Sequence, residues 1–209
     1  MVTERCDGVY DITCREDGGK RIRVFLFDGE PPTLVDAGFA DTAHRIFEAA
    51  EDLGVNPERL LITHGDGDHV GGFDALVDHY GLETWVPEQT NLSAEHAADH
   101  RYGDGDRIGP FTAVHVPGHE PDNHVLIDET AGIAVMGDAL SGADQRGLPA
   151  GYFHLPPACY SQDLNQAEES LERLLDYEFE VGLVFHGSSV LEDASEKLVR
   201  YVTFPGKPS

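Results

Sequence analysis

The chain has 209 residues, of which 39 are acidic and 14 basic, giving a formal net charge of −25. This length suits one domain with a sizeable core, so we predict a single domain over residues 1–209. So much negative charge argues against a nucleic acid as partner, because its phosphates would be repelled. The acidic residues are spread along the chain, which disfavours a local acidic face for a basic partner. The composition instead predicts a surface that stays hydrated in concentrated salt, and hence a halophilic source.

Neither an apolar leader nor a long apolar run is present, so we expect a cytoplasmic protein that does not bind membranes. The three cysteines are Cys6, Cys14 and Cys159. The spacing of Cys6 and Cys14 matches no zinc ribbon, so we interpret them as structural residues that could face each other across a hairpin. The sequence gives no indication of the oligomeric state.

The N-terminal part is predicted to form paired strands. Val9–Thr13 and Ile22–Phe27 are rich in strand-forming residues and flank the turn-forming Asp17-Gly18-Gly19. Thr33–Gly38 has the pattern of a further strand that ends in a tight turn.

A helix is predicted after this turn, because apolar residues recur there at helical spacing as far as Gly54, which would end it. Asp41 or Thr42 is placed to cap its start. This helix would cover one face of a sheet. Its apolar residues are Ala43, Ile46, Phe47, Ala50 and Leu53.

The densest group of reactive side chains comes next. An apolar run ending at Ile62 leads into His64, Asp66, Asp68 and His69, so two imidazoles and two carboxylates fall within six residues. The glycines between them let the backbone bend so that the side chains converge. Nitrogen and carboxylate donors converging at a strand end make a metal site. A polar turn with chance histidines is the alternative.

The chain then continues with a helix predicted over Gly71–Tyr80 and a short strand over Glu83–Val86. Asn91–His100 is polar and has a weak helical pattern. Four histidines in this half have few apolar neighbours and are interpreted as surface residues. They are His44, His79, His96 and His100.

In the second half, three apolar runs predicted to be strands each end in a residue that can bind a metal. These are Phe111–Val116 before His119, Ile133–Met136 before Asp138, and Val181–Phe185 before His186.

The remaining elements of this half are a strand and two helices. His124–Asp128 is predicted to be the strand, and apolar stripes predict helices at 164–175, with Asp163 near the start, and at 191–201. His115 alternates with apolar neighbours and is expected on a sheet surface.

This order of residues resembles the metallo-β-lactamase superfamily, whose pattern is HxHxDH followed by a His, a bridging Asp and a last His. The resemblance extends from about Val24 to Tyr201 and is to glyoxalase II-like metallo-hydrolases. It implies an α/β fold, a four-layered αβ/βα sandwich of two mixed β-sheets with helices on the outer faces. The residues that carry it are His64, Asp66, Asp68, His69, His119, Asp138 and His186.

One position departs from the pattern, because Asp66 stands where the family usually has its second His. A carboxylate adds negative charge and a harder oxygen ligand, which favours iron or manganese, although zinc also accepts it. The resemblance further suggests Asp36 as a support for the metal loop, with a plain turn residue as the equal alternative. A polar residue near His124 supports the site in many relatives, so His124 is a candidate for that role.

The correspondence implies two divalent metal ions per chain, zinc or iron, with manganese also suitable. Two such ions can share a water and lower its pKa from about 15.7 to near 7, which supplies hydroxide at neutral pH. Asp68 is the candidate catalytic residue that orients this nucleophile or handles its proton. The implied ligands are His64, Asp66 and His119 for one ion, Asp68, His69 and His186 for the other, and Asp138 as the bridge.

The segment between Asp138 and the late helix carries the information on substrate. It is long enough to form a wall over the metals. Arg146 could bind an anionic group of the substrate and Tyr160 could donate to a developing oxyanion, although a stiff loop whose aromatic residues only pack is equally open. A metal-activated hydroxide makes Cys159 unnecessary as a nucleophile.

Three functions therefore remain open. The leading prediction is a metal-dependent hydrolase that cleaves a small ester-type substrate, a thioester or lactone. The alternatives are a non-haem iron oxidoreductase resembling persulfide dioxygenases, and a metal-binding protein without catalysis. A persulfide dioxygenase would need only His64, His119 and Asp138 around one iron.

Overall fold

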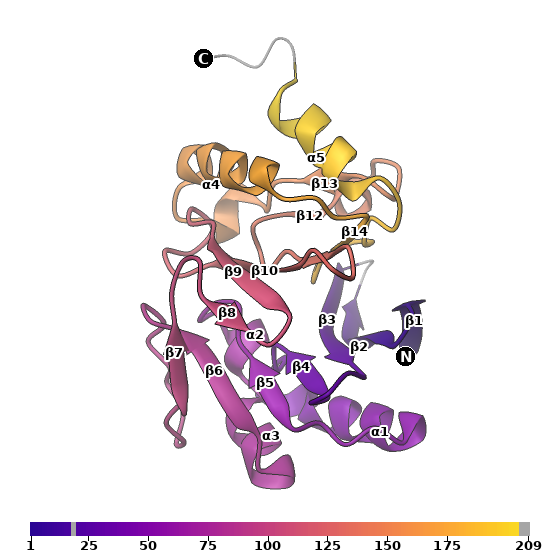
Figure 1. Ribbon diagram of the computed structural model, residues 1–209, viewed down its shortest axis with the longest axis vertical. Helices are drawn as coiled ribbons and strands as arrows, with labels where there is room; N and C mark the ends of the chain where they lie inside the picture. The colour runs from indigo at the N-terminus through magenta and orange to yellow at the C-terminus, as the bar shows by residue number, and fades with distance from the viewer. Residues whose placement is uncertain (18–19, 205–209) are drawn as a thin grey trace. The chain divides into compact units, whose positions relative to one another are not determined.

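The computed structural model describes residues 1–17 and 20–204. Its chain forms two compact units, Met1–Tyr102 and Gly103–Ser209. Each unit has its own mixed β-sheet with helices, as Figure 1 shows by label and colour. The single domain over residues 1–209 stays a prediction.

The first unit is built on a seven-stranded sheet in sequential order from β1 to β7. Neighbouring strands run antiparallel from β1 to β4 and parallel from β4 to β7, so the sheet is mixed. The strands are β1 Val2–Cys6, β2 Val9–Asp17, β3 Lys20–Phe27, β4 Thr33–Val35, β5 Arg59–Leu61, β6 Glu83–Pro87 and β7 His100–Tyr102.

The paired N-terminal strands are found where the sequence predicts them, but the two cysteines do not face each other. Cys6 pairs with Val9 across the β1–β2 hairpin, and Cys14 lies beyond the last β1 partner, Ile12. The expected pairing is wrong because the short turn at Gly8 sets the register. Burial raises the pKa of the Cys14 thiol to about 12, in keeping with a structural role. Gly18 and Gly19 of the expected turn lie outside the described residues.

The helices of this unit are η1 Ala40–Thr42, α1 Ala43–Leu53, α2 Gly67–Val70 and α3 Phe73–Tyr80. In Figure 1, α1 and α3 lie along the same face of the sheet. Ile46 from α1 and Phe73 from α3 are fully buried there in one apolar cluster with Leu34 and Leu60 of the strands. Gly54 ends α1 in a left-handed conformation at φ 69°, as the sequence predicts.

The weak helical pattern in Asn91–His100 does not produce a helix, because no residue from 91 to 99 is helical. The backbone N–H groups of Glu95 and His96 instead donate to the carboxylate of Asp74 on α3, at 2.9 Å each. Satisfying these donors with a side chain removes the need for helical hydrogen bonds.

The second unit contains a five-stranded sheet in the order β14-β11-β10-β9-β8. The pairs from β8 to β11 are antiparallel and β11 pairs with β14 in parallel. A separate two-stranded ribbon joins β12 and β13. The strands are β8 Arg107–Ile108, β9 Phe111–His115, β10 His124–Asp128, β11 Ile133–Val135, β12 Ser141–Gly142, β13 Phe153–His154 and β14 Val181–Leu183.

The helices of the second unit pack on one face of its sheet. Leu171 and Leu198 are buried in the same apolar cluster as Val114 and Val125 of the strands. The predicted late helix begins after Asp163, whose carboxylate accepts hydrogen bonds from the backbone N–H groups of Asn165 and Gln166. The helical elements are η2 Ala143–Arg146, η3 Ala158–Tyr160, α4 Leu164–Ser170, η4 Leu171–Asp176 and α5 Ala194–Val202.

Within the described residues, no helix has the length and apolar character needed to span a membrane.

Candidate metal centre

The first unit presents its four predicted metal ligands directly after β5. His64 and Asp66 lie in the loop, while Asp68 and His69 belong to the short helix α2. Nε2 of His64 is 3.7 Å from Oδ2 of Asp66, and Nε2 of His69 is 4.0 Å from Oδ2 of Asp68. The two imidazole rings are 4.0 Å apart between centroids. The loop therefore gathers two imidazoles and two carboxylates, as the sequence indicates.

Asp36 orients His69 from the turn after β4. Its Oδ2 lies 2.6 Å from Nδ1 of His69, so the imidazole donates from Nδ1 and keeps Nε2 unprotonated for a metal. Both side chains are almost completely buried. This contact favours the role of Asp36 as a support for the metal loop over that of a plain turn residue.

The same carboxylate also acts on His64 through Thr63. The Thr63 hydroxyl donates to Oδ2 of Asp36 at 2.8 Å, and its oxygen is 3.0 Å from Nδ1 of His64. A hydroxyl whose proton is already donated accepts from Nδ1–H, which leaves Nε2 of His64 as the ligand atom. The backbone N–H of Thr63 donates to Oδ1 of Asp36 at 2.7 Å. One carboxylate thus sets the tautomer of both histidines.

Close backbone packing holds α2 against the turn that carries Asp36. The N–H of Ala37 donates to the carbonyl of His69 at 2.7 Å. A Cβ at Gly72 would lie 2.3 Å from the carbonyl oxygen of Ala37, a distance that no side chain tolerates. Glycine is therefore required here for His69 to lie next to Asp36.

In the second unit, two histidines meet one aspartate. Nε2 of His119 lies 3.3 Å from Oδ2 of Asp138, and Nε2 of His186 lies 3.2 Å from the same oxygen. His119 follows β9, Asp138 follows β11 and His186 follows β14, so three strands of one sheet supply all three residues. His119 and Asp138 are buried.

Sequence reasoning did not identify several residues that support this set. The Ser161 hydroxyl donates to the carbonyl of Pro157 at 3.1 Å and lies 3.3 Å from Nδ1 of His119, which leaves Nε2 of His119 for a metal. The side-chain oxygen of Asn123 accepts the backbone N–H of Asp138 at 3.0 Å. Here Asn123 has the supporting contact for which His124 was the candidate.

A further support holds the loop that carries His186. The carboxylate of Asp144 accepts from the backbone N–H and the hydroxyl of Ser188, both at 2.7 Å. Gly142 donates its N–H to the carbonyl of His186 at 2.8 Å. These contacts join loops more than forty residues apart, so spacing in the sequence gives no signal for them.

Several of the other histidines contact backbone carbonyls or carboxylates. Nδ1 of His124 lies 2.7 Å from the carbonyl of Asp122, and burial lowers its pKa to about 4, so the imidazole is neutral at pH 7. Nε2 of His115 is 2.7 Å from the carbonyl of Pro121. His96 contacts Asp78 and His100 contacts Glu83, in keeping with surface positions.

The two predicted substrate contacts are exposed. Arg146 ends η2, and Tyr160, in η3, has 61% of its surface exposed. Neither side chain forms a hydrogen bond or ion pair with a predicted ligand among the described residues. Tyr160 directly precedes Ser161, so its segment is fixed to the His119 loop.

The donor chemistry fits metal binding. Imidazole nitrogen and carboxylate oxygen suit zinc, iron and manganese. Within each unit, the predicted ligands bring imidazole nitrogens and carboxylate oxygens within 4.0 Å of one another. Because three of the four imidazoles have their Nδ1 atom at a protein oxygen, their Nε2 atoms are set for this role.

Comparison with known proteins finds similarity to one family. The model described as the metallo-beta-lactamase superfamily matches residues 21–96. Hydroxyacylglutathione hydrolase GloC of Haemophilus influenzae is 29% identical over 60% of this chain and 70% of that protein. Atrochrysone carboxyl ACP thioesterase of Passalora fulva is 28% identical over 82% of this chain and 49% of that protein. The chain thus spans about half the length of this thioesterase.

Solved structures agree on the fold. A metallo-beta-lactamase from Pontibacter korlensis superposes with a TM-score of 0.75 at 19% identity, covering 97% of this chain and 96% of that one. FIM-1 from Pseudomonas aeruginosa, in its mono-zinc form, gives 0.72 at 20% identity, with coverage of 98% and 96%. Residues 21–96 thus resemble the metallo-β-lactamase superfamily, and the chain has the α/β sandwich fold of these structures. The predicted resemblance and fold class are confirmed, whereas a halophilic source gains no support and stays a prediction.

Proposed function

We propose that this chain hydrolyses a small thioester or lactone with two divalent metal ions bound at its histidines and aspartates. The proposal combines the family, the two ligand sets and the pattern of their positions in the chain. The proposed ligands are His64, Asp66 and His119 for the first ion, Asp68, His69 and His186 for the second, and Asp138 for both.

The observation that carries a two-metal site is the arrangement around Asp138. A single oxygen, Oδ2, lies within 3.3 Å of the Nε2 atoms of both His119 and His186. These histidines are assigned to different ions, so an aspartate with one oxygen close to both suits a bridging ligand. A protein that bound one ion would need only part of this set.

Two bound ions would lower the pKa of a water from about 15.7 to near 7 and would polarise the substrate carbonyl. The chain's own side chains would orient the water, accept its proton and position the ligand histidines. Asp68 is partly exposed beside His69, and we assign it the orientation of the attacking water and the removal of its proton. Asp36 and Thr63 hold the Nδ1 atoms of His69 and His64, which makes Nε2 of each histidine the proposed ligand atom.

The substrate class rests on the relatives and on the segment after Asp138. One relative is named a thioesterase and another a hydrolase of hydroxyacylglutathione. We propose that the exposed Arg146 attracts an anionic part of the substrate and that Tyr160 donates to the oxyanion. Both side chains are exposed and therefore accessible to a ligand.

The identity of the metal is a separate proposal. Asp66 supplies an oxygen where an imidazole is usual, and we propose that this shifts preference toward iron or manganese without excluding zinc. The Asp66→His variant should retain metal and gain preference for zinc in competition with iron. Unchanged selectivity would show that Asp66 does not bind the metal.

The proposed setting is the cytoplasm, with a small-molecule substrate and neither nucleic acid nor membrane as partner. The net charge of −25 supports the absence of nucleic acid, because like charges repel.

The test begins with elemental analysis of protein purified without added metal, where about two ions per chain are expected. A panel of thioesters and lactones then identifies the substrate. His186→Ala should reduce hydrolysis by at least about a hundredfold, the upper range for weakened metal support. His44→Ala, at an exposed histidine of α1, is the control and should retain activity. One ion or fewer per chain, with full activity in His186→Ala, would contradict the proposal.

A second candidate function needs only part of the ligand set, in which His119 and Asp138 already lie 3.3 Å apart. A persulfide dioxygenase would use His64, His119 and Asp138 around one iron and leave positions open for oxygen. Oxygen uptake with a persulfide substrate, insensitive to His186→Ala, would support this function over hydrolysis.

A further inference from the structure

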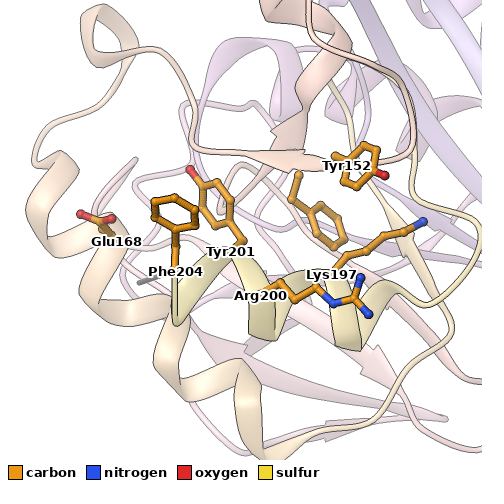
Figure 2. A pocket seen from close by; sticks show the side chains of 7 residues that line it. Tyr152, Glu168, Lys197, Arg200, Tyr201 and Phe204 are labelled. Atoms are coloured by element: carbon orange, nitrogen blue, oxygen red, sulfur yellow. The ribbon is translucent and has the colours of Figure 1, made fainter. Parts of the chain in front are cut away.

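The second unit contains a cavity that involves none of the proposed metal ligands. Its volume is about 600 Å³, within the range of small-molecule sites. Figure 2 shows the side chains that line it, which come from α5 and the residues just after it, from α4 and from the segment around β13.

Aromatic rings form much of the lining of this cavity. Phe153 is buried and Tyr201 is partly buried, whereas Tyr152 is 53% exposed and Phe204 is 64% exposed. Tyr201 is held in place by the backbone N–H of Leu155, which donates to its hydroxyl at 3.0 Å. Exposed aromatic faces beside anchored ones are suited to stacking against a flat ring.

Two cations lie on the same cavity. Lys197 and Arg200 are three residues apart on α5, so they lie on one face of the helix. Nζ of Lys197 is 5.4 Å from the ring centroid of Tyr152, and Lys197 has no carboxylate partner among the described residues. Arg200 pairs with Glu196 at 2.9 Å, but both are exposed, so this pair is weak and easily exchanged. Two neighbouring cations match a phosphate better than a single carboxylate.

A carboxylate completes the lining. Glu168 of α4 and Lys197 lie at opposite ends of the row of side chains in Figure 2. A ligand that fills the cavity therefore meets cations at one end, aromatic rings along its length and a hydrogen-bond acceptor at the other end.

We propose that this cavity binds a mononucleotide whose base carries an amino group. The phosphate would lie at Lys197 and Arg200, the base would stack on Tyr201 and Phe204, and the amino group would donate to Glu168. The site is independent of the proposed hydrolysis.

The net charge of −25 does not prevent such binding. At about 0.15 M salt the screening length is about 8 Å, so distant carboxylates contribute little and the two adjacent cations dominate. We therefore expect measurable affinity at physiological ionic strength and weaker binding in molar salt.

The test is calorimetric titration of the metal-loaded protein with AMP, adenosine and IMP. AMP serves as the probe because a monophosphate sequesters metal less than a triphosphate does. We expect AMP to bind with a Kd of roughly 10 µM to 1 mM, the range open to a ligand of this size. Adenosine and IMP should each bind at least about fivefold more weakly, because each lacks one charged or polar contact.

Variants locate the site. Lys197→Met should weaken AMP binding about tenfold, as expected for the loss of a charge-assisted contact. Arg45→Met is the matched control, because Arg45 also forms an exposed helical pair, with Glu48 on α1, and should leave AMP binding unchanged. Glu168→Gln should weaken AMP more than IMP.

Three results would overturn the proposal. AMP and adenosine binding equally well would show that the cations do not act on a phosphate. AMP binding that survives Lys197→Met but is lost in His186→Ala would place the nucleotide at the metals. The absence of any heat at millimolar AMP would exclude the site.

Discussion

Asp36 combines a strained backbone conformation, full burial and three hydrogen bonds. It adopts a left-handed backbone conformation at φ 64°, which is uncommon outside glycine and is best tolerated by Asp and Asn. It is fully buried and accepts from Thr63 twice and from His69 once. Strain and burial at one position are expected where a site is preorganised.

This leads to a prediction for Asp36→Asn. Asparagine keeps the backbone conformation and the shape, but its NH₂ group would oppose a donor of Thr63 or His69. Metal affinity should fall about 10- to 100-fold, as for other residues that orient metal ligands. Competition with a chelator measures it, and Asp52→Asn, at an exposed position of α1, is the control. Equal affinity in all three proteins would show that Asp36 only shapes the turn.

His124 shows how burial alone makes a residue sensitive to pH. Burial is the main cause that lowers the pKa of His124 to about 4, and the nearby His115 lowers it further. The hydrogen bond to the Asp122 carbonyl acts in the opposite direction and raises the pKa. Between pH 6.5 and pH 4 the unfolded chain binds a proton at His124 that the folded chain does not. Stability from this group is therefore complete above pH 6.5 and decreases as the pH falls toward 4.

The corresponding prediction compares the wild type with His124→Asn, whose amide keeps a donor near the Asp122 carbonyl. From pH 7.5 to pH 5, the free energy of unfolding of the wild type should fall by about 2 kcal/mol more than that of the variant. Urea unfolding of metal-free protein measures both, which removes the effect of protonating the ligands. Parallel pH profiles for the two proteins would refute this assignment.

At the scale of single residues, the sequence predicted side chains that lie close together in the chain. His64, Asp66, Asp68 and His69 stand within six residues, so their convergence could be inferred from a bent loop. The contact of Asp144 with Ser188 could not, because it depends on how two distant loops meet. Asn123 was passed over for His124 because an imidazole looks more like a site residue than an amide does.

At the scale of elements, strand ends carry the site and glycines let helices approach them. Gly118, directly before His119, has a φ of 133°, and a Cβ there would lie 2.1 Å from the backbone nitrogen of Ala167 on α4. The N–H of Asp163, the α4 cap, also donates to the carbonyl of Gly118 at 2.8 Å. The position of His119 thus depends on a close contact between its loop and a helix.

We therefore predict that Gly118→Ala loses both stability and metal. Gly105→Ala is the matched control, because Gly105 also has a positive φ, of 80°, but its added Cβ meets nothing within 4 Å. The control should lose about 1 kcal/mol from backbone strain, and Gly118→Ala more than about 3 kcal/mol because the clash adds to it. Thermal unfolding and metal content measure the two effects. Similar losses in both variants would mean that α4 moves aside freely.

Regular elements were predictable where one physical signal dominated. Apolar periodicity located α1 and α5, and short apolar runs located β9, β10 and β11. The segment from Asn91 to Asp99 was not predictable, since its backbone donors are satisfied by Asp74 from another element. The register of β1 against β2 also escaped prediction, because it depends on a short turn with a bulge that composition does not reveal.

At the scale of the whole molecule, the charge is the dominant feature. The 14 basic residues cannot pair with more than a minority of the 39 acidic ones. Several pairs that do form are on the surface, such as Arg15 with Asp41 and Arg200 with Glu196, and exposed pairs of this kind stabilise little. Most carboxylates therefore repel one another with only solvent ions to screen them.

The final prediction follows from this repulsion. The screening length is about 30 Å at 0.01 M salt and about 3 Å at 1 M, so lowering the salt lets each carboxylate act on many more of the others. The unfolded chain is more expanded and suffers less repulsion, so the folded state should lose stability as salt is removed. We expect Tm to rise by at least about 5 °C between 0.01 M and 1 M potassium chloride, which corresponds to roughly 1 to 2 kcal/mol for a chain of this size. Sucrose is the control, because it stabilises compact states through exclusion from the surface without screening charge. A Tm that is flat in potassium chloride would contradict both the repulsion and the adaptation to salt.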